Sequence, residues 1–196
     1  VALPALHLLT AWLSRVTAEA DAAGLPTDFG GSEEAVERSV LNYPDFIVFD
    51  LDPYIYSGQE AKGAEPELNR RAFAKVVELA RALKELLDQL YLSSFVKSSG
   101  KTGLHIFVPI ERHYDYDVTR KACELIGRHL MRERPKDVTM DWAVGKRAGR
   151  VFLDHNQNTR TKNMAAIYSP RPAPGAPVSM PLRWEELGEV YPTDFT

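Results

Sequence analysis

Cysteine and long apolar runs are scarce in this chain of 196 residues. Its single cysteine, Cys123, excludes a disulfide framework and any zinc site built from several cysteines, and it suits a reducing cytoplasm. No apolar run approaches the roughly 18 residues that a membrane span needs. No signal-peptide pattern opens the chain. These absences predict a cytoplasmic protein without a membrane partner.

An excess of basic residues is also absent, because 24 lysines and arginines face 27 aspartates and glutamates, a formal net charge of −3. Such a charge is not typical of a protein that binds polyanions, so any nucleic-acid surface must be local or assisted by bound cations. Hydrophobic residues make up 44% of the chain. This length and composition indicate one globular domain that buries a full core without a metal or disulfide.

Regular patterns become clear from Phe46 onward, and we therefore divide the chain into an N-terminal segment, 1–41, packing on a main domain, 42–196. Helical spacing of apolar residues or short β-branched and aromatic runs define the expected elements. The expected strands are 46–49, 95–96, 104–108, 138–142, 151–153 and 164–168, and the expected helices are 66–90, 117–132 and 184–187. Helices interspersed with several short strands predict an α+β domain with the helices packed on the sheet.

Two aspartates, Asp50 and Asp52, follow the first apolar run. Because side chains alternate along a strand, both carboxylates point to one face while Phe49 and Leu51 point to the other. Two carboxylates this close repel each other unless a cation lies between them, and oxygen ligands suit Mg²⁺ or Mn²⁺. We interpret the pair as metal ligands; a solvated strand end is the alternative.

The turn that runs from Ser98 to Gly103 offers backbone amides, hydroxyls and the ammonium group of Lys101, all of which suit phosphate oxygens. It is not a P-loop, because the first glycine of that motif would fall at Phe95 and a strand follows the turn. His105 stands in that strand, where it could donate a hydrogen bond to a phosphate or be a buried core histidine.

Asp154 ends the apolar run 151–153 and could complete a three-carboxylate site. Three carboxylates that hold two divalent ions suit the two-metal scheme of nucleotidyl transfer. A helix or turn cap explains Asp154 equally well. Among the cations that follow, Arg171 has the most rigid setting, between Pro170 and Pro172, and an arginine fork matches phosphate geometry.

Several segments resemble the archaeo-eukaryotic primase superfamily and, more specifically, the polymerase domain of bacterial and archaeal DNA ligase D. The three superfamily motifs correspond to FDLDP at 49–53, SGKTGLH at 99–105 and VFLD at 151–154. Further matches are NYPD at 42–45, YSPR at 168–171, PGAPV at 174–178 and PLRWEEL at 181–187. The likeness covers the chain from about Asn42 to its end.

The resemblance implies a primase-like (RRM-like) mixed or antiparallel sheet with flanking helices, carrying a carboxylate metal site. It also implies a DNA-directed DNA/RNA polymerase of non-homologous end joining. Such a nucleotidyltransferase extends a primer at DNA ends or in gapped duplex from nucleoside triphosphates, prefers ribonucleotides and uses two Mn²⁺ or Mg²⁺ ions. A DNA ligase and a Ku-like protein are the expected partners, and the nucleoid is the expected location.

Carried over position by position, the resemblance also implies roles for individual residues. The catalytic metal ligands would be Asp50, Asp52 and Asp154. The residues along the nucleotide would be Ser99, Gly100, Lys101, Gly103 and His105, with Arg147 and Arg171 as further triphosphate or template contacts.

Members of this family usually carry a larger N-terminal portion that stacks on the incoming base and grips the downstream 5′-phosphate, and we expect that portion to be missing here. The family often has a His-x-Trp element, and Thr10 stands at the position of its histidine, unless His7 substitutes. The long linker 54–65 resembles the stand-alone or archaeal-type branch.

Two alternatives remain open. One is a non-catalytic relative that binds nucleotide or a DNA end; the other is a haloacid-dehalogenase-like phosphatase, in which Asp50 would be a nucleophile.

Overall fold

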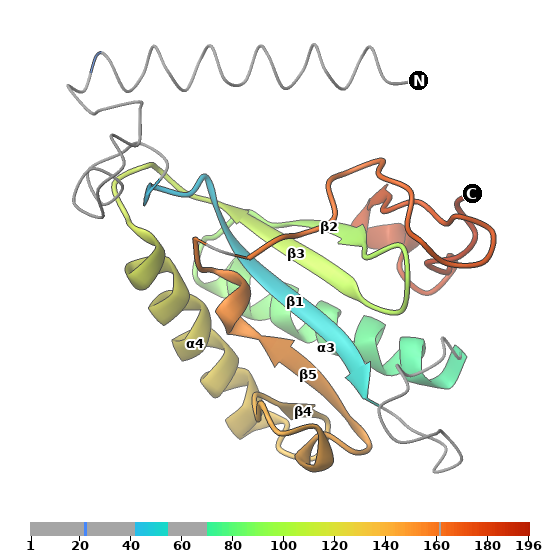
Figure 1. Cartoon of the computed structure of the whole chain (residues 1–196). Coiled ribbons are helices and arrows are strands. Elements are labelled where there is room, and N and C mark those ends of the chain that lie inside the picture. The colour runs from blue at the N-terminus through green and yellow to red at the C-terminus, as the bar shows by residue number, and fades with distance from the viewer. Residues whose placement is uncertain (1–21, 23–41, 55–69, 161) are drawn as a thin grey trace.

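A six-stranded sheet forms the centre of the computed structural model, which describes residue 22 and residues 42–54, 70–160 and 162–196 (Figure 1). The predicted N-terminal segment, with Thr10 and His7, therefore lies outside the described residues except for Ala22. The strands are β1 (Phe46–Tyr54), β2 (Phe95–Ser98), β3 (Leu104–Pro109), β4 (Val138–Thr139), β5 (Arg150–Asp154) and β6 (Pro181–Leu182). Their order is β4-β5-β1-β3-β2-β6, and every pair is antiparallel except β4 with β5.

Two long helices, α3 (Arg70–Gln89) and α4 (Tyr116–Glu133), cover one face of the sheet. α3 forms because apolar residues recur at helical spacing, and its buried stripe runs from Phe73 to Leu87. The carboxylate of Asp115 caps α4 by accepting a hydrogen bond from the Val118 amide. In Figure 1, α3 passes behind the sheet and α4 runs along its β5 side. The predicted α+β class is confirmed.

The hydrophobic core lies between this sheet face and the helices. Phe49 and Leu51 of β1 are completely buried there, as are Ile106 of β3 and Leu153 of β5. Gly127 of α4 packs directly against the Leu153 side chain. Since alternate residues point the opposite way, the other face of the sheet carries the polar side chains of Asp50 and His105 together with the aromatic rings of Phe46 and Phe107.

Three of the expected strands differ most from the structure. The strand predicted at 164–168 is wrong: a turn closed by the Ser169 amide and the Ala166 carbonyl bends this segment, and β6 takes the edge of β2 instead. β4 ends at Thr139 because its hydroxyl accepts a hydrogen bond from the Asp141 amide, which turns the chain. β1 continues through Asp52 to Tyr54, paired with β5.

Short 3₁₀ helices connect these elements: η2 (Val144–Lys146), η3 (His155–Gln157) and η4 (Trp184–Glu186). The last of these matches the short helix expected at 184–187. Within the described ranges, no helix has the length and apolar character that crossing a membrane requires.

Candidate active site

Strand register places four polar side chains in one row across the open face of the sheet. Asp50 of β1 lies opposite Asp154 on one side and opposite His105 on the other, and His105 lies opposite Lys97 of β2. All four side chains are buried. Residues that are far apart in the sequence thus form one continuous polar strip.

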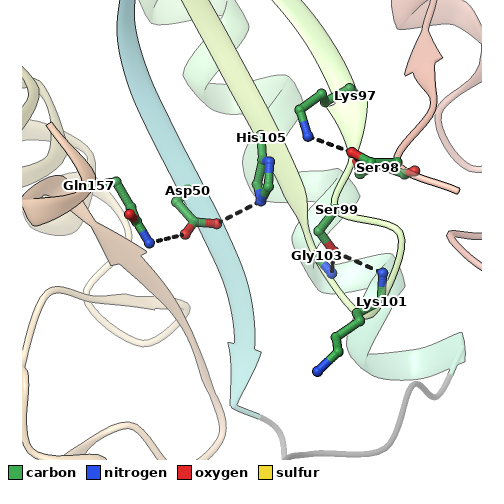
Figure 2. A network of polar contacts seen from close by, with 9 residues as sticks. Asp50, Lys97, Ser98, Ser99, Lys101, Gly103, His105 and Gln157 are labelled. Atoms are coloured by element: carbon green, nitrogen blue, oxygen red, sulfur yellow. Dashed lines mark hydrogen bonds and ion pairs between the residues drawn. The ribbon is translucent and has the colours of Figure 1, made fainter. Parts of the chain in front are cut away.

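The Asp50 carboxylate lies at the centre of this strip, and Figure 2 shows Gln157 and His105 approaching it from two sides. Gln157 Nε2 donates a hydrogen bond to Asp50 Oδ2 at 3.1 Å, and His105 Nε2 lies 3.3 Å from Oδ1. Burial raises the pKa of Asp50 well above its usual value, and the carboxylates of Asp52 and Asp154 raise it further. The site is therefore short of positive charge when Asp50 is ionised.

His105 does not supply that charge. Burial, together with the positive charges of Lys97 and Arg171, lowers the pKa of His105 to about 3, so the ring is neutral near pH 7. Lys97 is the cation within the row. Burial lowers its pKa to about 8 although Asp50 opposes the shift, and its Nζ donates a hydrogen bond to Ser179 Oγ at 2.6 Å.

Ser99 organises the turn between β2 and β3. Its hydroxyl oxygen accepts hydrogen bonds from the amides of Lys101 at 3.2 Å and Gly103 at 3.0 Å, as drawn in Figure 2. The Ser99 amide in turn donates to the Gly103 carbonyl at 2.9 Å. Gly100 has a φ of +74°, a backbone conformation that favours glycine. Ser99 thus shapes the turn by hydrogen bonds within it.

Gly103 lets this turn approach β1 closely. A Cβ atom at this position would lie 2.2 Å from the Leu51 carbonyl oxygen and 3.0 Å from Asp52 Oδ1. Any larger residue would push the turn away from β1. The glycine therefore brings the turn next to the acidic pair.

A cavity of about 230 Å³ opens between the acidic pair and the turn. Arg171 contributes to its wall, and both Arg171 Nε and Asp50 Oδ1 are buried without a hydrogen-bond partner among the described residues. The cavity is lined by Asp50, Asp52, Pro53, Ser99, Lys101, Thr102, His105, Gln157, Asn163, Met164, Ala165 and Arg171. The structure thus brings together most of the site residues expected from the sequence; Gly100 and Gly103 shape the turn behind them.

Apart from the two glycines, two expected site residues, Asp154 and Arg147, do not line this cavity. Asp154 Oδ1 accepts a hydrogen bond from the Asn156 amide at 2.9 Å and so caps η3, the alternative role that its position in the sequence allowed. Its carboxylate nevertheless raises the pKa of Asp50.

Arg147 is buried beside β5 instead. Its guanidinium group lies 3.4 Å from the centroid of the Phe152 ring and donates hydrogen bonds to the carbonyl oxygens of Asp141 at 2.8 Å and Trp142 at 2.6 Å.

Lys97 and Gln157 were not among the residues singled out from the sequence. A lysine inside a short apolar strand is a signal that could have identified Lys97.

Gln157 has no comparable signal, since its position depends on its neighbour Asn158. The Asn158 side chain accepts from the Val48 amide and donates to the Val48 carbonyl, both at 2.8 Å. β5 pairs with β1 only from Asp50 onward, so the backbone N–H and C=O of Val48 have no strand partner on the β5 side. The Asn158 side chain takes the place of that partner, and these hydrogen bonds hold η3 beside Asp50.

The donor chemistry at the cavity fits a divalent cation. Asp50 and Asp52 both face the cavity, and their mutual repulsion would be relieved by a cation with oxygen ligands. Across the described ranges, however, no three His, Cys, Asp or Glu side chains are arranged as a metal cage. The pair fits a site completed by water or phosphate oxygens, and the three-carboxylate arrangement with Asp154 stays a prediction.

Helices on one face of a mainly antiparallel sheet, with an acidic pair and the glycine-rich β2–β3 turn on the other, place this protein in the primase-like class of α+β domains. Residues 32–196 match the family described as "LigD, primase-polymerase domain", and the chain belongs to that family. The predicted resemblance and the primase-like fold are thereby confirmed. Family membership also excludes the phosphatase alternative.

Similar proteins come from several bacteria. The chain is 34% identical over 150 residues to the multifunctional non-homologous end joining protein LigD of Pseudomonas aeruginosa, covering 76% of this chain and 16% of that protein. It is 31% identical over 143 residues to the multifunctional non-homologous end joining DNA repair protein LigD of Mycobacterium tuberculosis, with 73% and 17% covered.

A solved structure, the polymerase domain from Mycobacterium tuberculosis ligase D in complex with DNA, matches with a TM-score of 0.62 and 30% identity. The match covers 74% of this chain and 46% of the other. The chain therefore spans about a sixth of the curated relatives' length and just under half of the solved domain.

Proposed function

We propose that the chain carries the catalytic face of an end-joining repair polymerase. This nucleotidyltransferase would add nucleotides, preferentially ribonucleotides, to a primer strand at DNA ends or gaps. The observation that carries the proposal is the cavity where Asp50 and Asp52 face the β2–β3 turn, Lys101 and Arg171. Membership of the LigD family, whose named relatives act in end joining, supports it, as does the DNA in the solved relative.

The turn and its neighbouring cations suit the triphosphate. The Lys101 ammonium and the Arg171 guanidinium line the cavity and would neutralise phosphate oxygens there, with the arginine fork also fixing their orientation. Holding the triphosphate rigidly beside the acidic pair supplies positioning, which is a large part of catalysis in phosphoryl chemistry. The turn is prepared for this task, because hydrogen bonds to Ser99 already fix its shape.

Neutral His105 and Gln157 orient the Asp50 carboxylate from its two sides. A proton on His105 Nε2 would point toward Asp50 Oδ1, while the Gln157 amide donates to Oδ2. Lys97, protonated below pH about 8, adds a positive charge to the same strip. Gln157 and Lys97 lower the pKa of Asp50, in opposition to burial, and with His105 they would aim the carboxylate at the cavity.

Asp50 and Asp52, with Asp154 as the third carboxylate of the prediction, would hold Mn²⁺ or Mg²⁺. Two such ions, when bound, supply charge stabilisation for the attacking hydroxyl and for the leaving pyrophosphate.

Primer extension on a gapped duplex with a 5′-phosphate, in Mn²⁺, tests the proposal. Wild type should incorporate nucleotides, and the double variant Asp50→Ala/Asp52→Ala should not. Asp88→Ala is the matched control, because Asp88 is an exposed acid at the end of α3. Equal incorporation by wild type and the double variant would refute the assignment. Parallel reactions with ribo- and deoxyribonucleotides test the proposed sugar preference.

A second candidate, a non-catalytic module that binds nucleotide or a DNA end, is favoured by the placement of Asp154, which caps η3 and does not line the cavity with Asp50 and Asp52. It predicts Mn²⁺-dependent nucleotide binding, lost in the double variant, without incorporation by any variant. We propose further that a DNA ligase and a Ku-like protein act with the chain, which co-purification of each with the full chain tests.

A further inference from the structure

Trp142 is a large aromatic side chain at the surface, with 61% of its area exposed, between β4 and η2. Two cations lie close to its ring: the Arg147 guanidinium carbon is 5.5 Å from the ring centroid, and Lys162 Nζ is 5.4 Å from it. Lys146 and Arg150 lie in the same segment, where Lys146 pairs with Asp141 at 3.8 Å. In a chain with a net negative charge, two cations thus lie beside one exposed indole.

Two contacts place Trp142 at the rim of the candidate active site. Its ring packs edge-to-face on Phe152, with centroids 6.3 Å apart, and Phe152 is the strand partner of Asp52. Lys162, whose Nζ lies 5.4 Å from the centroid of the indole, directly precedes Asn163 in the cavity wall. Trp142 therefore contacts the strand partner of Asp52 and the residue next to Asn163, which places it beside the cavity, although neither Phe152 nor Lys162 lines the cavity itself.

The position of Trp142 is fixed although its ring is exposed. Arg147, only 4% exposed, donates to the Trp142 and Asp141 carbonyl oxygens and stacks on Phe152. Arg147 thus acts as a positioning residue for the loop that presents Trp142. A rigid aromatic ring loses little conformational entropy when a ligand packs against it.

We infer that Trp142 is the stacking platform for an unpaired base of the DNA strand, and that Lys162 contacts a neighbouring phosphate. An aromatic face flanked by cations is the common way to hold single-stranded nucleic acid, because every base has a π-face and every link carries a charge. This inference rests on the proposed function.

The sheet order favours the DNA strand over the incoming nucleotide as the occupant. The acidic pair stands on β1. The β2–β3 turn lies on one side of β1, and Trp142 packs on β5 on the other side of β1. A triphosphate on the turn and a base on Trp142 would thus lie on opposite sides of Asp50 and Asp52. Strand extension requires the triphosphate and the end of the DNA strand to approach the acidic pair from opposite sides.

Fluorescence anisotropy tests the inference with two labelled oligonucleotides of equal length, oligodeoxythymidine and its fully abasic counterpart. Trp142→Ala should weaken binding of oligodeoxythymidine at least about fivefold, since stacking of one base contributes that much or more. Binding of the abasic strand should change little. Lys162→Gln should lower the salt dependence for both strands, by about one in the log–log slope.

Matched variants separate stacking from bulk and from folding. Trp142→Phe should retain most of the affinity for oligodeoxythymidine, whereas Trp142→Leu, apolar but without a π-face, should lose it. Tyr91→Ala, which removes an aromatic ring that is 96% exposed beyond α3, should bind like wild type. Thermal unfolding of each variant checks that the fold is intact, and the comparison of Phe with Leu stays informative if the alanine variant unfolds.

An equal loss on both strands, no loss on either, or an equal loss for Tyr91→Ala would overturn the inference. Selective loss of ribonucleotide binding, with oligonucleotide binding unchanged, would overturn it too, because the occupant would then be the incoming nucleotide. These readouts need no catalysis. Failure of the stacking inference is therefore distinguishable from failure of the proposed polymerase activity, which the Asp50→Ala/Asp52→Ala reaction reports.

Discussion

Replacing Gly103 with alanine should damage both stability and the candidate site. The added Cβ would lie 2.2 Å from the Leu51 carbonyl oxygen, and backbone atoms of a central strand cannot rotate away as a flexible side chain can. A shift of about 0.8 Å is needed before this contact reaches 3.0 Å, the shortest separation that real Cβ atoms tolerate. The turn between β2 and β3 must therefore move away from β1.

The free energy of unfolding should fall by about 1–3 kcal/mol, the usual cost of forcing an extra methyl group into a packed site. For a chain of this size, that cost lowers the melting temperature by roughly 2–12 °C. The same shift moves the turn and Lys101 relative to Asp52, and displacements near 1 Å at a reacting centre cost about a hundredfold in activity. Nucleotide affinity and incorporation should both fall by more than tenfold and by up to about a hundredfold.

Thermal unfolding and titration with a labelled ribonucleoside triphosphate in Mn²⁺ measure the two effects. Gly145→Ala is the matched control, because no atom lies within 4 Å of the position where its Cβ would be. If Gly103→Ala unfolds within 1 °C (about the error of the assay) of both wild type and Gly145→Ala, the close approach of the turn to β1 is refuted.

Three further results are expected. Lys97→Met should stabilise the protein below pH 8 by at most about 3 kcal/mol. The gain in stability should shrink as the pH rises from about 8, the pKa of Lys97 in the folded protein, to 10.5, its ordinary pKa, because burial penalises only the charged form. Denaturant melts at several pH values measure the gain, and a gain independent of pH would contradict this reasoning. Mn²⁺ should raise the melting temperature of wild type and not that of Asp52→Asn, and equal shifts would remove Asp52 from the metal site. Lys101→Ala should raise the KM for nucleotide about tenfold or more in primer extension, while Lys84→Ala, a partly exposed lysine of α3 outside the cavity lining, should leave it unchanged. An unchanged KM in Lys101→Ala would show that Lys101 does not contact the triphosphate.

Local patterns predicted much of the fold and part of the site. Alternation along β1 was sufficient to place Asp50 and Asp52 on the face opposite Phe49, and the structure confirms this by burying Phe49 in the core. Helical spacing predicted α3 and α4 to within a few residues over the described ranges. These predictions succeeded because side-chain direction in a regular element depends only on neighbouring backbone angles.

Segments near the sheet edge were harder to predict. The apolar run 164–168 has the composition of a strand, but β6 occupies the edge of β2, and Tyr168 adopts a φ of +61° within a turn. Composition cannot decide such a case, because which segment pairs with an edge depends on parts of the chain far away in sequence.

The sequence by itself determined the acidic pair, the glycine-rich turn and, through a series of short motifs, the primase-like family, since each motif consists of residues within a few positions of one another. Only the tertiary structure decided which side chains stand beside Asp50. Strand register aligned His105 and Lys97 with it, a side-chain bridge from Asn158 fixed Gln157, and the stacked Arg147 fixed Trp142 at the rim. The physical reason is that register and packing are set by hydrogen bonds and contacts between distant segments, and a one-residue slip would reverse the face of every side chain.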